Sequence, residues 1–257
     1  MSTDFPPGTP NWVDLATTDV AGATSFYDTL FDWTVEDLGP DSGGYGMIRK
    51  NGRMVAGIGL AANPGQPTAW SVYFATDSAD DTAAKIRANG GTVVLEPMDV
   101  MEQGRMAVCQ DPAGAFFSVW QPGQHRGAEV IDEPGTLNWV ELMTTDIPAT
   151  KTFYEAVFGV STRDVEMGPP GMVYTLLSVG EKAVAGAMPI GPEHGPMPSH
   201  WTVYFTVEDC DAVADHAAKL GGGEMLRDDS PAGRFAFLTD PQGGAFSIIQ
   251  PNPDFVV

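Results

Sequence analysis

The chain has 257 residues, enough for two domains of ordinary size, and its 43% hydrophobic and 18% charged residues are typical of globular rather than disordered proteins. A net charge of −21, from 34 acidic and 13 basic residues, repels phosphate backbones and anionic headgroups, so neither nucleic acid nor a membrane surface is an expected partner. With no basic segment leading into an apolar run and no stretch of about 18 apolar residues, we expect a cytoplasmic protein.

In chain order, the first half predicts a strand, a helix and further strands. Strand 12–17 precedes Asp19, which is placed to cap a helix whose apolar residues recur at helical spacing over 20–31. Asn51-Gly52 is a strong hairpin signal, so strands 45–50 and 53–60 are expected around it, with a third strand around 57–61. The same order then returns as strand 70–76, helix 79–88 and strands 92–98, 104–110 and 115–121.

The second half repeats the first. Residues 8–27 return as residues 135–154, and eleven of the twenty positions are identical. A period of 127 residues indicates a duplicated domain rather than a solenoid, so each half is expected to bury a core of its own. We predict a first domain over 1–122, a linker over 123–134 and a second domain over 135–257.

These motifs resemble a known family. A capping Asp, a helix containing Phe26-Tyr27, a Gly-Gly turn and an Asp111-Pro hairpin before a last strand ending in Gln121-Pro122 are similar to the vicinal oxygen chelate superfamily, which includes glyoxalase I, extradiol dioxygenases and bleomycin-resistance proteins. The resemblance covers nearly the whole chain, and its tandem form is similar to two-domain actinobacterial glyoxalase-like proteins. It implies an α+β fold in which each half pairs two βαβββ modules into a curled, mostly antiparallel sheet around a cavity, with helices outside.

The resemblance also bears on metal binding. Metal-dependent members carry His or Glu ligands on the first strand of each module and Glu on its last strand. The corresponding positions here hold only indole and hydroxyl side chains: Trp12, Ser71, Ser118, Trp139, Thr202 and Ser247. A transition metal needs three or four N, O⁻ or S⁻ donors at one point, so we predict no metal and no other cofactor.

The cavity face follows from strand alternation. Trp12 and Asp14 share one face of their strand, and the resemblance turns that face inward. The candidate ligand-binding residues are Trp12, Asp14, Ser71, Tyr73, Ser118, Trp120, Trp139, Glu141, Thr202, Tyr204 and Ser247. In one interpretation a flat ligand stacks on the aromatic rings while a carboxylate fixes its hydroxyl or cation. In the other, the indoles only fill the sheet and the carboxylates are hydrogen-bonded structure.

Two further features recur in both halves. Arg105 and Arg234 begin equivalent strands, where a structural salt bridge is the favoured interpretation over an anion grip. The loops 39–45 and 167–174 are either lids over the cavities or simple connections.

Two functions compete. The first is a metal-free protein that binds or sequesters a small aromatic molecule, as in the drug-resistance branch of the family. The second is an enzyme of lyase, isomerase, dioxygenase or hydroxylase type, either metal-dependent through unrecognised ligands or metal-free with Asp14 or Glu141 as the catalytic group. A further interpretation makes one half a degenerate copy kept for packing. The expected state is a monomer with two pseudo-equivalent domains or a homodimer.

Overall fold

A computed structural model describes residues 5–39, 42–63, 65–167, 173–191 and 195–255. Each half of the chain forms one eight-stranded mixed sheet with two helices. The first half contains β1 (Pro10–Thr17), α1 (Val20–Phe31), β2 (Thr34–Asp37), β3 (Gly46–Lys50), β4 (Arg53–Leu60), β5 (Ala69–Ala75), α2 (Ala79–Ala88), β6 (Thr92–Val100), β7 (Gly104–Gln110) and β8 (Phe116–Pro122). Its strand order is β2-β3-β4-β1-β5-β8-β7-β6.

The second half repeats this topology. It contains β9 (Leu137–Thr144), α3 (Ile147–Phe158), β10 (Ser161–Glu166), β11 (Val173–Val179), β12 (Lys182–Pro189), β13 (His200–Thr206), α4 (Cys210–Lys219), β14 (Gly223–Ser230), β15 (Gly233–Thr239) and β16 (Ala245–Pro251). The order β10-β11-β12-β9-β13-β16-β15-β14 matches the first sheet strand for strand. The predicted α+β fold of two tandem domains, each made of two βαβββ modules, is therefore confirmed, while the residue boundaries drawn for the domains stay a prediction.

One strand was predicted in the wrong place. The third strand of the first module is β2, which precedes the hairpin, whereas residues 57–60 simply continue β4. β2 has only four residues, mostly exposed and polar, and lies at the sheet edge, so it carries no apolar alternation to reveal it. The strand β10, equally polar, was missed for the same reason.

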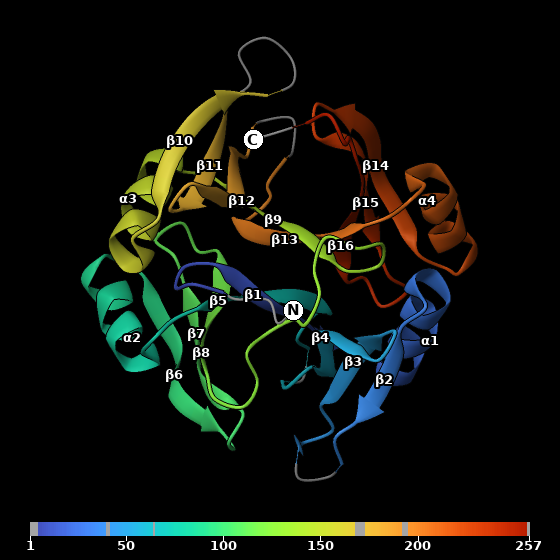
Figure 1. Cartoon of the computed structure of the whole chain (residues 1–257), viewed down its shortest axis with the longest axis horizontal. Helices are drawn as coiled ribbons and strands as arrows, with labels where there is room; N and C mark the ends of the chain where they lie inside the picture. Colours follow the sequence, from blue (N-terminus) through green and yellow to red (C-terminus); the bar gives the residue numbers. More distant parts are fainter. Residues whose placement is uncertain (1–4, 40–41, 64, 168–172, 192–194, 256–257) are drawn as a thin grey trace.

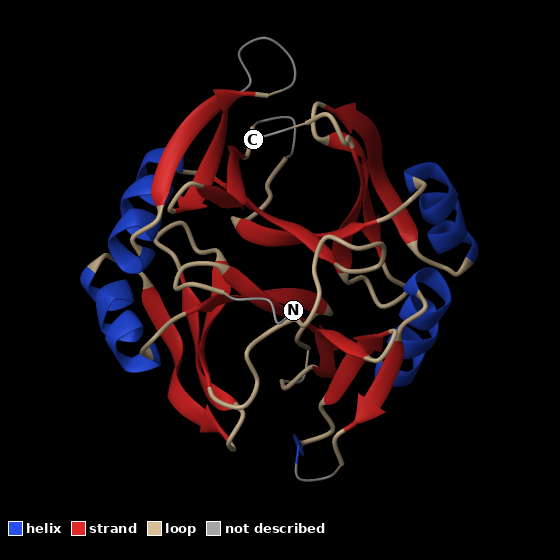
Figure 2. Cartoon of the chain, viewed as in Figure 1, coloured by secondary structure: helices blue, strands red, loops and turns tan. Residues whose placement is uncertain are grey.

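The two sheets pack back to back. Figure 1 shows the central strands β1 and β5 beside β9 and β13, with each sheet curling away from the other, and Figure 2 shows the four helices of the described chain in two pairs at the sides. Across the junction the rings of Trp70 and Phe205 lie 5.1 Å apart, as do those of Phe74 and Trp201. Among the described residues, no helix is long and apolar enough to cross a membrane.

The core is shared between the halves, so the expectation of one separate core per half is wrong. A single cluster of buried side chains joins Val13 and Phe74 of the first sheet to Val140 and Phe205 of the second. The physical reason is that each sheet buries its convex apolar face against the other sheet and against helices from both halves. Neither half covers that face alone.

Two equivalent hydrogen-bond chains fasten the halves together. The Tyr27 hydroxyl on α1 donates to Asp240 in the last hairpin of the second half at 3.1 Å, and it accepts from Trp70 Nε1 at 3.0 Å. The counterpart chain runs from Trp201 Nε1 through Tyr154 to Asp111 of the first half, at 2.9 and 3.3 Å. Each hairpin Asp also accepts backbone N–H groups of its own turn, so one carboxylate closes a hairpin and holds the other half.

We predict that Tyr27→Phe lowers the free energy of unfolding by about 1–2 kcal/mol, because it leaves the Asp240 carboxylate and the Trp70 indole N–H without their buried partner. Urea unfolding of Tyr27→Phe, Asp240→Asn and the double variant should give a coupling energy between the two sites. Tyr154→Phe, at the equivalent place, should cost a similar amount. Phenylalanine variants as stable as the parent would contradict a fastening role for these hydrogen bonds.

Candidate functional site

The concave face of each sheet carries the residues predicted to line the cavities. In the first half, Trp12, Tyr73 and Trp120 form a buried cluster with Met47 and with Ala128 of the linker, separate from the main core. Among the other predicted positions, Ser118 and Ser247 are buried, and Ser71 and Thr202 are partly buried. The predicted alternation is therefore followed, because Val13 and Leu15 lie in the main core on the opposite face.

A hydrogen-bonded network surrounds the carboxylate of the first half. Asp14 accepts from the Tyr73 hydroxyl at 2.8 Å and from the Tyr45 hydroxyl at 3.3 Å. Tyr45 in turn accepts from Trp12 Nε1 at 3.0 Å. Trp12, Asp14 and Tyr73 are thus joined as predicted neighbours, and Tyr45 completes the set.

The second half contains the same network with a longer acid. The two carboxylate oxygens of Glu141 accept from Tyr174 at 2.8 Å and from Tyr204 at 2.9 Å, and Trp139 Nε1 donates to Tyr174 at 2.9 Å. The same four positions are linked in both halves, with only Asp replaced by Glu, which indicates an arrangement inherited with the duplicated domain.

A glycine in each half makes room for the network. A Cβ atom on Gly57 would lie 1.7 Å from the Tyr45 hydroxyl, and one on Gly186 would lie 1.8 Å from the Tyr174 hydroxyl. Each glycine pairs directly with the network acid on the neighbouring strand. This packing explains why a glycine recurs at these two equivalent positions.

Burial decides the electrostatics of both networks. It raises the pKa of Asp14 and of Glu141, while the hydrogen bonds donated by the tyrosines act in the opposite direction. Burial, and then the nearby acid, raise the pKa of Tyr174 and Tyr204 well above the usual range, so both phenols stay protonated donors. Each network therefore places a buried acid with a raised pKa beside fixed O–H donors.

The linker covers the concave face of the first sheet. The His125 ring lies edge-on to Trp12 with centroids 4.4 Å apart, it also contacts Trp120, and the His125 carbonyl accepts from Trp120 Nε1 at 2.9 Å. Backbone bonds from His125 N to Gln103 O at 3.0 Å and from Ala128 N to Asn11 O at 2.8 Å tie the linker to the turn between β6 and β7 and to the central strand β1. The first cavity is filled from within the chain.

The second sheet lacks such a cover in the described part of the chain, which ends with a turn over Asn252–Phe255. Trp139 is partly exposed, whereas its counterpart Trp12 is only 4% exposed. Phe235 and Phe237 of β15 are also partly exposed on the concave side, with the Phe237 ring 6.0 Å from that of Tyr204. The duplicated faces are thus equivalent in sequence and different in access.

Several of these residues were not predicted from the sequence. Tyr45 and Tyr174 fall at the ends of the loops interpreted as lids, and only their equivalence under the repeat could have marked them. His125 lies in the predicted linker, and nothing in the sequence of 123–134 shows where the linker packs. The lid hypothesis concerns loops that include residues 40–41 and 168–172, which lie outside the described residues.

The family's metal site does not fit these side chains. The six ligand positions hold Trp, Ser and Thr, and the described residues contain no group of three or more His, Cys, Asp or Glu side chains able to hold a metal ion. Arg105 pairs with Asp80 and Asp99, and Arg234 pairs with Asp211 and Asp229. These two arginines form the structural salt bridges that were favoured over anion binding.

Comparison with known proteins agrees with the fold and the tandem arrangement. The model of the Glyoxalase/Bleomycin resistance protein/Dioxygenase superfamily matches residues 9–119 and 136–248. The "Anthracycline biosynthesis protein DnrV" of Streptomyces peucetius is 40% identical over 264 residues, covering 96% of this chain and 95% of the relative. "Putative glyoxylase CFP32" of Mycobacterium tuberculosis (strain CDC 1551 / Oshkosh) is 40% identical over 257 residues, covering 97% of both chains.

Solved structures share the fold at low identity. The 2,3-dioxygenase LapB from Pseudomonas sp. KL28 has a TM-score of 0.67 at 14% identity, covering 99% of this chain and 97% of its own. The Mn(II)-bound glyoxalase from Novosphingobium aromaticivorans has a TM-score of 0.65 at 16% identity, covering 95% and 82%. At these identities the likeness describes the fold alone.

We predict that His125 destabilises the folded state in mild acid. Burial lowers the pKa of its ring from 6.5 to about 4. The imidazole of the unfolded chain is therefore protonated below about pH 6.5, whereas that of the folded chain stays neutral down to about pH 4. Its contribution to stability is fully present above this window and is lost as the pH falls through it. Between about pH 7 and pH 5 the parent should lose about 2 kcal/mol more than His125→Phe, as measured by urea unfolding.

The buried acids have raised pKa values, so their contribution to stability increases as the pH falls. This contribution is the same in the parent and in His125→Phe, so it cancels when the two proteins are compared. Equal pH dependence in parent and variant would show that His125 is not buried as a neutral ring.

Proposed function

Because the chain belongs to the glyoxalase/bleomycin resistance protein/dioxygenase superfamily, we propose that it binds a small aromatic molecule on the concave face of its second sheet, without a metal ion. The observation that carries this proposal is the Trp139–Tyr174–Glu141–Tyr204 network on a face where Trp139 is partly exposed. The equivalent first network is covered by the linker. The predicted sites of the two halves are thus proposed to differ, one for binding and one for packing.

The lining supports a planar ligand. Trp139, Tyr204, Phe235 and Phe237 offer ring faces and edges, and such contacts add roughly 0.5–1.5 kcal/mol per aromatic pair beyond the area they bury. Glu141 supplies a carboxylate on this face, where it can accept a hydrogen bond from a ligand hydroxyl or pair with a cation. A flat ring system bearing a hydroxyl or an amine matches both features. A relative named for anthracycline biosynthesis supports the use of an anthracycline as a first probe.

A second candidate function is metal-free catalysis. It is favoured by Glu141, which is 7% exposed and whose pKa is raised by burial, since an acid that retains a proton nearer neutral pH can act as a general acid or base. In that case the two tyrosine hydroxyls would hold the carboxyl in place. The reaction would be of the lyase or isomerase type found in this superfamily, with Glu141 carrying the proton.

We predict that Trp139→Ala weakens the binding of an anthracycline or a hydroxylated anthraquinone about tenfold, because the ligand loses a ring to stack on. Glu141→Gln should weaken the same ligands by a similar factor through loss of a charge-assisted hydrogen bond. Isothermal titration of the intact protein measures both affinities, and circular dichroism checks that each variant is folded.

Asp14→Asn is the matched control, because it alters the equivalent acid on the covered face and should leave affinity unchanged. Titration after treatment with a metal chelator should also give the parent affinity. Absence of saturable binding across the panel, or equal losses in Asp14→Asn and Glu141→Gln, would refute the proposed site. A chelator-sensitive affinity would refute the metal-free part.

A measurement of turnover distinguishes an enzyme from a binding protein. If the bound probe is converted to product, turnover in the parent should vary with pH as Glu141 titrates, and Glu141→Gln should lose at least about a hundredfold in rate while still binding the probe. Binding without conversion at any pH favours sequestration. Conversion that survives in Glu141→Gln would exclude this acid as the catalytic group.

A further inference from the structure

The first sheet contains a fork between two parallel strands. The pairing of β1 with β4 begins at Asp14 and Gly57, so the preceding residues of the two strands are not paired with each other. The linker enters this fork. Ala128 N donates to Asn11 O on one strand, and Glu129 N donates to Met54 O on the other, both at 2.8 Å. Because consecutive N–H groups of an extended chain point to opposite sides, two neighbouring linker residues bridge both strands.

Side chains reinforce the seat of the linker. Glu129 accepts from Met54 N at 2.6 Å, and Glu133 further along accepts two bonds from the Arg53 guanidinium at 3.0 and 2.5 Å. Gly127 permits the close approach, since it has φ +117° and a Cβ there would lie 2.4 Å from Asn11 O. The segment in the fork thus provides a small residue, Ala128, two backbone N–H donors and an acid, Glu129, next to the basic start of β4.

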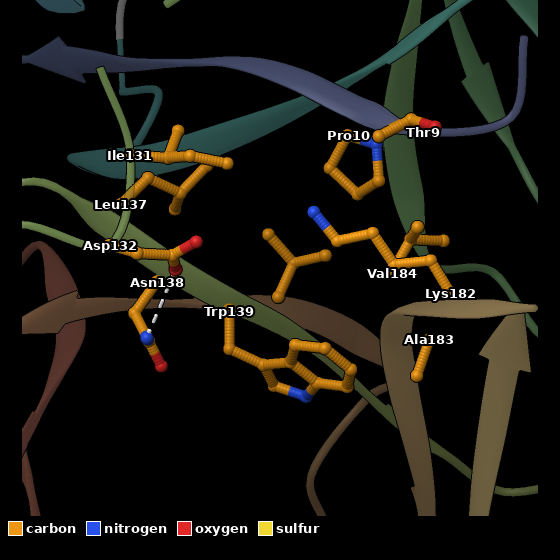
Figure 3. A pocket seen from close by; sticks show the side chains of 11 residues that line it. Thr9, Pro10, Ile131, Asp132, Leu137, Asn138, Trp139, Lys182, Ala183 and Val184 are labelled. Atoms are coloured by element: carbon orange, nitrogen blue, oxygen red, sulfur yellow. Dashed lines mark hydrogen bonds between the residues drawn. The ribbon is translucent and has the colours of Figure 1, made fainter. Parts of the chain in front are cut away.

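The second sheet has the same fork, and none of the residues that the structure describes is inserted between its two strands. β9 and β12 begin to pair at Glu141 and Gly186, and a pocket of about 190 Å³ lies before that point (Figure 3). Its walls include the counterparts of the residues around the first fork, namely Asn138, Trp139, Val140, Lys182, Ala183 and Val184. Thr9, Pro10, Ile131, Asp132 and Leu137 complete the lining.

The charge of the first fork is retained. Lys182 stands where Arg53 stands in the first half, and Figure 3 shows its side chain extending across the pocket. Trp139 forms the floor in that view, while Asn138 donates to Asp132 at 3.2 Å at the far wall. The Lys182 amine lies near the Asp132 carboxylate of the same pocket, and it can also pair with the carboxylate of an extended segment at the open ends of the two strands, although the chain as a whole is acidic.

We propose that the fork between β9 and β12 binds an extended peptide segment of another protein, of the form Gly-small-acidic, as a short strand added between the two. The first half contains the intramolecular equivalent of this complex. The partner's main-chain N–H groups would bond to Asn138 O and Ala183 O. Its acid would accept from Ala183 N, as Glu129 accepts from Met54 N, with the Lys182 amine nearby. This site takes a peptide rather than an aromatic ring, and it stands whether or not the concave face binds the proposed small molecule.

The test uses the linker's own sequence as the probe. An acetylated, amidated peptide of residues 127–130, Gly-Ala-Glu-Val, is titrated into the intact protein by isothermal titration and by ligand-observed saturation-transfer NMR. We expect one-to-one saturable binding at about millimolar concentration or below. Methylation of the Ala amide nitrogen should weaken binding about tenfold, because it removes one bridging donor. Replacing Glu by Gln in the peptide should weaken it about threefold to fivefold.

Protein variants localise the effect. Lys182→Glu should weaken the peptide at least about fivefold, whereas Lys219→Glu makes the same charge change at the exposed end of α4 and should leave affinity unchanged. Lack of saturation up to about 10 mM peptide, equal binding of the methylated peptide, or equal losses in the two lysine variants would overturn the proposal. None of these measurements uses an aromatic ligand, so a failure here is distinct from a failure of the proposed function.

Discussion

The structure depends on the burial of two apolar sheet faces against each other. A curled sheet with helices at its sides leaves its convex face open at the centre, and in this chain a second copy of the same sheet closes it. Aromatic pairs such as Trp70 with Phe205 fill the junction, and the bonds from Tyr27 and Tyr154 to the opposite hairpins fix its geometry. The duplication therefore builds the core, and it leaves both concave faces pointing away from the centre.

The two concave faces lie outside the shared core, and they differ in their access to solvent. Both retain the Trp–Tyr–acid–Tyr network, in which burial and hydrogen bonding act in opposite directions on the pKa of the acid. The covalent connection between the halves covers one face, because the linker has to pass from β8 to β9 and packs His125 and Ala128 over the first network on the way. One copy is thus covered by the linker, and its equivalent has, among the described residues, a partly exposed Trp139 and an open strand fork. Asymmetric access follows from chain connectivity rather than from a change in the network residues.

Much of the fold was predictable because its signals are local. Asp19 caps its helix as expected, and helices α1 and α2 have the predicted bounds, since apolar residues at helical spacing mark them directly. Alternation also assigned Trp12 and Asp14 to one face and Val13 and Leu15 to the other. The short polar strands β2 and β10 escaped prediction because an edge strand needs no apolar pattern. The lack of metal-binding side chains at the family's ligand positions could also be read from the sequence, because the residue type alone decides whether a side chain can donate to a metal.

The sequence by itself therefore determined the duplicated βαβββ order, the two lined faces and the lack of suitable metal donors at the family positions. Only the tertiary structure decided which residues meet. Tyr45 lies 31 positions from Asp14 and joins it because Gly57 leaves space beside the acid. The shared core and the covering of the first network by His125 depend on how two halves and a linker pack in space. No local pattern encodes such long-range contacts, because periodicity reports which face a residue lies on and not what will cover that face.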